Sequence, residues 1–152
     1  MICDVRLASE RFDPTAEFAA FNAKLSEEGA TVTFVGLARP RTRSGATVEN
    51  LFLEHHPRLT ERSLNEIATD AQARFGVSAI CVVHRYGAIS PGEAIVFVAA
   101  ADSHRRAAFE AAEYAMDRLK TDAVFWKRED GEDGSNWIEP TMIDQSDRAR
   151  WS

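Results

Sequence analysis

The chain has 152 residues, 45% of them hydrophobic and 28% charged, with a formal net charge of −6, and these values are typical of one globular domain. No apolar run approaches the about 18 residues of a membrane-spanning helix, and the N-terminus lacks the apolar stretch of a signal peptide, so we expect a cytoplasmic protein without a membrane partner. The acidic total argues against a nucleic-acid partner, because neutralising phosphates requires a basic surface.

The first third of the chain is predicted to contain one helix and three strands. A strand is expected over residues 2–8, and a helix begins at Asp13-Pro14 and ends before Gly29. Two further β-rich segments follow at residues 31–37 and 48–55. The polar loop between them carries three arginines, Arg39, Arg41 and Arg43.

The middle of the chain continues with a helix and a hairpin. Apolar residues recur at the helical interval from about residue 60 to residue 75, and Gly76 is expected to end this helix. Two strands, 79–86 and 94–101, are separated by a turn that contains Ser90-Pro91-Gly92. We expect these two strands to pair as a hairpin.

The longest helix is expected from about residue 103 to residue 121, with Asp102 or Ser103 as its N-cap. Its predicted buried stripe consists of Phe109, Ala112, Met116 and Leu119. A strand over residues 124–128, an acidic turn over 130–135 and a returning strand at Trp137-Ile138 follow.

Adjacent hairpin strands with separate helices indicate an α+β fold, with antiparallel strands and two to three packed helices. A doubly wound fold is disfavoured, because no crossover helix separates the two strands between residues 79 and 101. We expect one domain over residues 1–140 and a loosely held polar tail over 141–152, in which Trp151 is the one residue suited to docking.

Two lysines near the end of the longest helix are candidates for catalysis. Lys120 lies in the last turn of the helix, and Lys127 lies on the following strand between aromatic and basic residues. Side chains alternate along a strand, so Phe125 should share a face with Lys127, whereas Trp126 should point into the core. Partial burial and cationic neighbours lower the pKa of a lysine, which makes it useful in proton transfer near neutral pH.

Basic residues at the start of the same helix form a candidate anion site. His104 and Arg105 lie where free backbone N–H groups and the helix dipole favour negative charge. Sixteen residues separate His104 from Lys120, which corresponds to about 24 Å along a helix. The two ends therefore belong either to two sites or to one site shared across a homodimer, and we take the second as a hypothesis.

No metal site or cofactor is expected. Cys3 and Cys81 are the only cysteines and are predicted to be inert core thiols, so a reactive sulfur would have to come from another molecule. His84 lies in an apolar strand without a neighbouring acid or thiol, and we interpret it as structural.

Six ordered blocks over roughly residues 30–140 form one further pattern. They are Phe34-x-Gly36-x-x-Arg39, Leu53-Glu54-His55-x-Pro57, Val83-His84-Arg85-x-Gly87, Ser103-His104-Arg105 with Ala108-Phe109-Glu110-Ala111, Asp117-x-Leu119-Lys120, and Phe125-Trp126-Lys127-Arg128-Glu129 before Trp137. Together they resemble the large, catalytic subunit family of molybdopterin synthase.

The resemblance implies an α/β-hammerhead fold and a homodimer that binds two small ubiquitin-like sulfur-carrier subunits, forming a heterotetramer. It implies sulfur transfer from the carrier's C-terminal Gly-Gly thiocarboxylate to cyclic pyranopterin monophosphate, which gives the dithiolene of molybdopterin. Its catalytic residues would be Lys120 and Lys127. Its substrate-binding residues would be Arg39, Arg128 and Glu129 of one protomer, together with His104 and Arg105 of the neighbouring protomer. We also expect Arg41 or Arg43 to fold over the bound substrate.

A second interpretation makes the chain a non-catalytic adaptor. In that case the lysines and arginines would only clamp the C-terminus of a partner, and binding would yield no product. The test that separates the two is whether product forms when carrier and pterin are supplied together.

Overall fold

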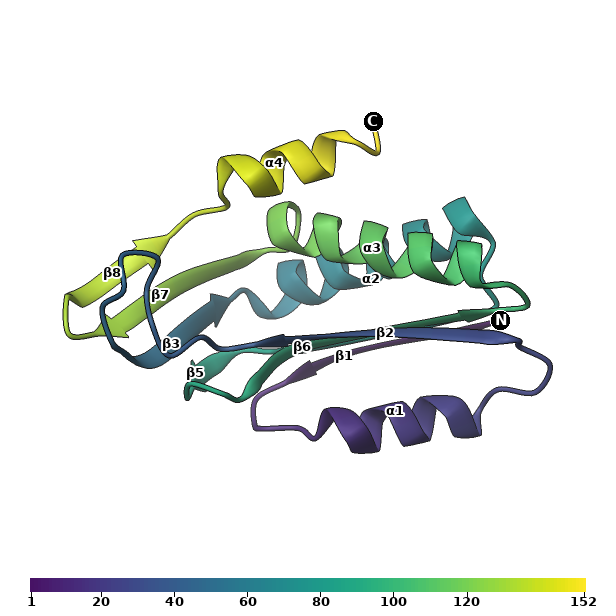
Figure 1. The fold of residues 1–152 in the computed structure, drawn as a ribbon, viewed down its shortest axis with the longest axis horizontal. Coiled ribbons are helices and arrows are strands. Elements are labelled where there is room, and N and C mark those ends of the chain that lie inside the picture. The colour runs from purple at the N-terminus through teal and green to yellow at the C-terminus, as the bar shows by residue number, and fades with distance from the viewer.

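The computed structural model describes residues 1–152 and contains eight strands and four helices in two four-stranded sheets (Figure 1). The strands are β1 (Ile2–Ala8), β2 (Ala30–Leu37), β3 (Val48–His55), β4 (Ala79–Arg85), β5 (Gly87–Ile89), β6 (Ala94–Asp102), β7 (Phe125–Gly131) and β8 (Gly134–Ile138). The helices are α1 (Pro14–Ala23), α2 (Pro57–Phe75), α3 (Arg105–Thr121) and α4 (Met142–Ala149). The α+β class is confirmed, with four helices in place of two to three. None of the helices is long and apolar enough to cross a membrane.

The first sheet has the strand order β1-β4-β6-β2 and carries helices on both faces. Only β1 and β4 run parallel, and the predicted hairpin is confirmed by the antiparallel pairing of β4 with β6, in which Val82 lies opposite Val98. Helices α2 and α3 cover one face and α1 covers the other (Figure 1). Strand β4 is therefore buried at every residue.

The main hydrophobic core lies between this sheet and the helices α2 and α3. Leu64 and Ile67 of α2 pack with Val82 and Val98 of the sheet, and all four are at most 1% exposed. Burying one such side chain contributes about 1.5–3 kcal/mol. The inner face of α3 is lined mainly by small residues, namely Ala108, Ala111, Ala112 and Ala115. Small side chains let α3 approach the sheet closely, which fixes the position of the helix end that carries Lys120.

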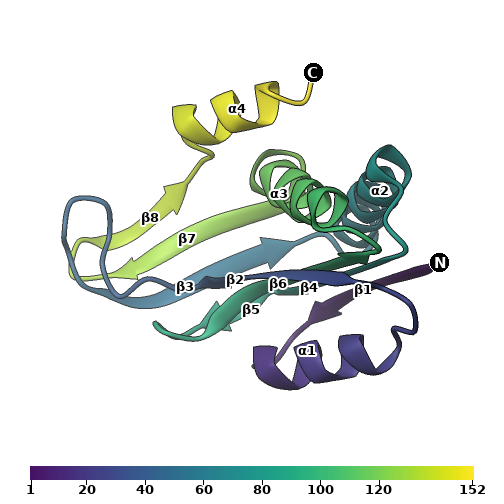
Figure 2. The same cartoon turned by 45° about the vertical axis from the view of Figure 1, so that its right-hand side comes forward.

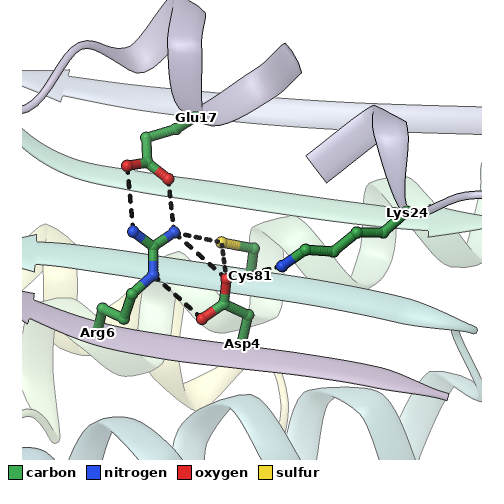
Figure 3. Close-up of polar contacts among 5 residues, drawn as sticks. All are labelled: Asp4, Arg6, Glu17, Lys24 and Cys81. Carbon is green, nitrogen blue, oxygen red and sulfur yellow. Dashed lines mark hydrogen bonds and ion pairs between the residues drawn. The ribbon is translucent and has the colours of Figure 1, made fainter. Parts of the chain in front are cut away.

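Polar contacts attach α1 to the opposite face of the sheet (Figure 3). Arg6 of β1 donates hydrogen bonds to Glu17 of α1 at 2.5 and 3.1 Å and also pairs with Asp4. Cys81 lies beside this pair, and burial raises the pKa of its thiol to about 11, as expected for a core thiol. Cys3 was expected in the core as well, but it is exposed on the edge strand β1.

The second sheet, with the order β5-β3-β7-β8, continues from one end of the first sheet (Figure 2). Strand β7 pairs antiparallel with β3 and β8, so the returning strand predicted after the acidic turn is confirmed. The short strand β5 was not predicted. Gly87 begins it with φ +86°, a left-handed conformation that glycine adopts without strain, and this turn leads the chain from the first sheet to the second.

Two helix boundaries differ from the prediction. Helix α1 ends at Ala23, before Gly29 as predicted, but α2 begins at Pro57 because the His56 ring caps it by accepting the Leu59 N–H. The N-cap of α3 is His104, whose side chain makes no capping hydrogen bond. Gly76 ends α2 in the left-handed conformation, as predicted.

Two aromatic residues expected in the core are exposed. Trp126 is 50% exposed, because Phe125 and Lys127 occupy the inner face of β7 and place Trp126 on the outer face. Phe109 of α3 is 56% exposed, since the neighbouring alanines form the inner face of that helix. Both predictions of burial were wrong.

The last residues form helix α4 and a short end segment that contacts the fold. Thr141 and Asp144 form a reciprocal capping box at the start of α4, and Trp151 packs edge-on against Phe75 and Tyr114 at ring-centre distances of 5.5 and 5.4 Å. The sequence suggested a loose tail because the apolar residues of this segment do not follow a helical stripe. The structure agrees that they are not buried, since Met142 is 89% exposed.

Candidate active site

A cavity of about 320 Å³ lies where the C-terminal end of α3 meets β7 and the loop before β3. Eleven of its 23 lining residues are hydrophobic, and they come from both sheets and from α3. Its charged lining residues are Arg39, Arg43, Lys120, Lys127, Glu129, Glu139 and Asp144. The cavity therefore gathers two of the chain's three lysines in a partly apolar setting.

Lys127 points into the cavity from the middle of β7. Its backbone lies between Leu53 of β3 and Ile138 of β8, and Phe125, two residues earlier, lines the same cavity. Burial, the positive charge of Lys120 and that of Arg39 lower the pKa of Lys127 to about 8. A substantial fraction of Lys127 is therefore uncharged at a mildly alkaline pH, as proton transfer requires.

Lys120 reaches the cavity from the last turn of α3. The helix ends at Thr121, and the carboxylate of Asp122, the C-cap residue, is held by Arg118. A positive charge in the last turn interacts favourably with the helix dipole, so this position suits a lysine. Lys120 is exposed, which leaves its ammonium accessible to a ligand that enters the cavity.

His84 lines the cavity as well, and the sequence prediction missed this. It is 6% exposed, its ring stacks on Phe125 with centres 4.2 Å apart, and its Nδ1 lies 2.8 Å from the Arg85 carbonyl oxygen. Burial, with smaller effects from Lys127 and Lys120, lowers the pKa of His84 to about 4, so the ring is neutral at pH 7. The only sequence feature that could have indicated a role for His84 in the site was its place in the block Val83-His84-Arg85-x-Gly87.

Asp144 brings a negative charge into the cavity from α4. Its carboxylate accepts the Thr141 N–H at 2.9 Å, which fixes its position at the helix start. Its charge acts on Lys127 in the direction opposite to that of Lys120. The spacing Thr141-x-x-Asp144 is a capping-box pattern and could have indicated a helix here.

The other predicted binding residues are divided between this cavity and more distant surfaces. Arg39 and Glu129 line the cavity. Arg128 points to the opposite face of β7, where it pairs with Asp130 and lies between the rings of Phe52 and Trp137. Within one chain, Arg128 therefore lies outside the cavity, because strand neighbours alternate.

His104 and Arg105 also lie outside the cavity of their own chain. They are exposed at the start of α3, whereas Lys120 lies at its end, about 24 Å away at the usual helical rise. One chain thus brings together Arg39, Glu129 and the two lysines, but not the basic residues at the helix start.

No cluster of three or more His, Cys, Asp or Glu side chains suited to a metal ion is present.

The arrangement is suited to binding and transforming an anion. Arg39, Arg43 and Lys120 make no ion pair within the chain, so their positive charges are available to a ligand. Lys127, with its pKa near 8, provides a group that can exchange protons beside that ligand. No cysteine lines the cavity, so the site offers no sulfur nucleophile of its own.

Known proteins resemble this chain over nearly its whole length. The family model of the MoaE protein matches residues 7–122. A molybdopterin synthase catalytic subunit from Caulobacter vibrioides is 48% identical over 147 residues, which cover 97% of this chain and 96% of the relative. The solved molybdopterin biosynthesis MoaE protein from Burkholderia ambifaria is 39% identical with a TM-score of 0.82, and the match covers 99% of this chain and 98% of that one. A chain from Helicobacter pylori, solved in a protein–protein complex of subunits 1 and 2 of molybdopterin-converting factor, shares the fold at 19% identity with a TM-score of 0.73 and coverage of 88% and 89%. This chain belongs to the MoaE family of molybdopterin synthase catalytic subunits.

Proposed function

We propose that this chain transfers sulfur from the thiocarboxylated C-terminus of a small ubiquitin-like carrier subunit to cyclic pyranopterin monophosphate. The product is the dithiolene of molybdopterin, made during molybdenum cofactor biosynthesis in the cytoplasm. The observation that carries the proposal is the meeting of Lys120 and Lys127 in one partly apolar cavity. Membership of the molybdopterin synthase catalytic subunit family supports it.

The charges of the cavity fit the charges of the two reactants. The cyclic phosphate and the thiocarboxylate are both anions, and they would repel one another in a site without fixed positive charge. Arg39 and Lys120 offset that repulsion from within one chain. The sulfur arrives on the carrier, in agreement with a cavity that contains no cysteine.

The two lysines have different environments, and we assign them different roles. Lys120, exposed at the helix end, would stabilise the oxyanion that forms when the carrier's terminal carbonyl is attacked. Lys127, with its pKa near 8, would exchange protons as the ring phosphate oxygen leaves. Arg39 and Glu129 would orient the pterin.

We propose that the working assembly is a homodimer with two carrier subunits, hence a heterotetramer. In that assembly, His104 and Arg105 of one protomer would complete the cavity of the other and contact the phosphate or the pterin. The separation of these residues from Lys120 within one chain motivates the proposal. Arg128, directed away from the cavity, is better placed to support β8 through Trp137 than to contact the pterin.

Reconstitution with purified components tests the function. The chain is mixed with thiocarboxylated carrier and the cyclic pterin, and molybdopterin is measured as its fluorescent oxidation product. The wild type should form product, and Lys120→Ala should form almost none while it still binds the carrier. Lys24→Ala is the matched control, because Lys24 is the only lysine outside the cavity.

The same experiment separates catalysis from the adaptor alternative. Stoichiometric carrier binding without product from the wild type would contradict the proposed function and support a clamp. Near-normal turnover by Lys120→Ala would contradict the role assigned to that residue alone.

A further inference from the structure

The loop between β2 and β3 has a defined structure. Arg41 and Thr47 form a β-bridge, the Thr42 N–H donates to the Ala46 carbonyl at 2.8 Å, and the Gly45 N–H donates to the Thr42 carbonyl at 3.0 Å. These bonds close the loop into a small hairpin. Its residues therefore hold fixed positions relative to one another.

The loop is also fixed to the second sheet. The Thr47 N–H donates to the Glu132 carboxylate at 3.1 Å, and the Glu132 N–H donates to the Thr47 carbonyl at 3.0 Å. Ala46 is 9% exposed, so part of the loop packs into the fold. Both views place the loop at the end of the second sheet, beyond the C-terminal end of α3 (Figures 1 and 2).

The three arginines of this loop differ in what their side chains contact. Arg41 donates to the Gly45 carbonyl oxygen at 3.1 Å and so serves the loop itself. Arg43 lines the cavity, is exposed, and makes no hydrogen bond or ion pair within the chain. Arg39, two residues after the end of β2, also lines the cavity without a hydrogen bond or ion pair within the chain. Of the two residues expected to fold over a substrate, Arg43 is the one positioned to do so.

Within one chain, Arg43 is one of the four cations that give the cavity its net positive charge. Four cationic and three anionic side chains line it, so the lining carries one net positive charge when Lys127 is protonated. Without Arg43 the charges would balance, and deprotonation of Lys127 would then make the lining negative. An anion would be repelled in the protonation state that proton transfer uses.

We propose that Arg43 binds the phosphate of the pterin substrate and sets the affinity of the cavity for it. The proposal rests on the function proposed above. A guanidinium matches two phosphate oxygens with two parallel N–H donors, and its charge strengthens both bonds. The carrier's only reacting anion is its terminal thiocarboxylate, which must lie at the lysines. Arg43 lines the cavity and has no partner within the chain, so its guanidinium is available to the phosphate.

Arg43→Gln tests the proposal, with Arg58→Gln as the control, because Arg58 is an exposed arginine of α2 outside the cavity. With saturating thiocarboxylated carrier, Arg43→Gln should raise the KM for the cyclic pterin by about tenfold or more, because a charge-assisted bond is lost. The kcat should change little, and Arg58→Gln should stay within about twofold of the wild type. Arg43→Lys should recover part of the affinity.

Direct calorimetric titration of the cyclic pterin, without carrier, gives a readout that does not require turnover. Arg43→Gln should weaken this binding as it raises KM, while its thermal unfolding and carrier affinity match those of the wild type. Unchanged pterin affinity would overturn the proposal, and so would a loss of carrier affinity with normal pterin affinity. A wild type that binds pterin through Arg43 but forms no product would contradict the proposed function instead.

Discussion

At Lys127, burial and neighbouring positive charge act in the same direction on one ammonium group. Burial removes water from the charged form, and the charges of Lys120 and Arg39 make that form less favourable still. Asp144 is the residue that opposes them. The protonation of Lys127 is thus set by residues from α3, α4 and the loop after β2.

The pKa of Lys127 should be measurable as a titration of its side-chain Cε resonance in a protein labelled with carbon-13 lysine. The midpoint should lie near pH 8. Lys120→Gln removes a cation and should raise it, whereas Asp144→Asn removes the opposing anion and should lower it. Lys24 is the third lysine of the chain and lies outside the cavity. A Lys127 midpoint near 10.5 in the wild type would contradict the prediction.

His84 should make the fold sensitive to mild acid. Its pKa is about 4 in the folded chain and 6.5 when unfolded, so between these values the unfolded state binds more protons. Stability is complete above pH 6.5 and falls as the pH drops to 4, by about 3 kcal/mol from this residue alone.

Urea unfolding at pH 7.5 and pH 4.5 measures that loss. His84→Phe keeps an aromatic ring against Phe125 but cannot bind a proton, so its free energy of unfolding should fall less between the two pH values than that of the wild type. His104→Gln changes an exposed histidine and serves as the control. Equal losses in the wild type and His84→Phe would contradict the prediction.

Sequence reasoning found part of the candidate site because part of its signal is local. Lys127 lies next to aromatic residues, and Lys120 ends a clear helical pattern, so both were visible without a fold. His84 and Asp144 were missed because they reach the cavity from β4 and α4, and only the packing of distant elements brings them to the lysines.

Helix α4 is held by contacts at its C-terminal end. Trp151 packs on Phe75 and Tyr114, its Nε1–H donates to Asp117 at 2.7 Å, and Arg150 donates to the same carboxylate at 2.7 Å. No residue of α4 itself is buried. Arg148 of α4 adds an ion pair with Asp122 at 3.1 Å, so the helix and its Asp144 depend on that pair and on the anchor that lies after the helix.

Trp151→Ala should release α4 without unfolding the sheets. Hydrogen exchange should accelerate over residues 142–149, and the free energy of unfolding should fall by about 1–2 kcal/mol. The pKa of Lys127 should fall further, because Asp144 would no longer oppose the neighbouring cations. Arg62→Ala removes an exposed ion pair on α2 and is the control. Unchanged protection of residues 142–149 would show that α4 has another anchor.

The elements that were predicted well have a strong apolar period, and those missed do not. Strand β3 was placed at its observed ends because residues 48–55 alternate regularly. Helix α4 has no such stripe, and β5 is three residues long. The faces of Phe109 and Trp126 were misassigned because burial of a face depends on what packs there, which local sequence does not specify.

On the scale of the whole molecule, β2 leaves one long edge of the first sheet uncovered. It is the outer strand, eight residues long, and Phe34, Val35 and Leu37 are 44%, 36% and 56% exposed. Unpaired backbone groups and apolar side chains favour pairing with another strand. This edge is the surface on which we expect the second protomer.

Val35→Lys should therefore convert the dimer into a monomer, because a charge on this edge disfavours strand pairing. Val35 does not line the cavity, so the substitution leaves that site intact within the chain. Sedimentation measures the change, and Ala88→Lys on β5, the outer strand of the other sheet, is the matched control. A Val35→Lys chain that still sediments as a dimer would place the interface elsewhere.

A site shared between protomers makes a sharper prediction, since two inactive variants should restore activity when mixed. In a mixed dimer of Lys120→Ala and His104→Ala, one cavity combines intact Lys120 with the partner's intact His104, and the other cavity lacks both. After complete exchange of subunits, half of the dimers are mixed and about a quarter of all cavities are complete, so molybdopterin formation should recover to about a quarter of the wild-type rate. Mixing Lys120→Ala with Lys127→Ala is the control, because both residues lie in the same chain's cavity and no complete site can form. Subunit exchange is verified by mass spectrometry. If the first mixture then recovers no activity, His104 does not act across the dimer.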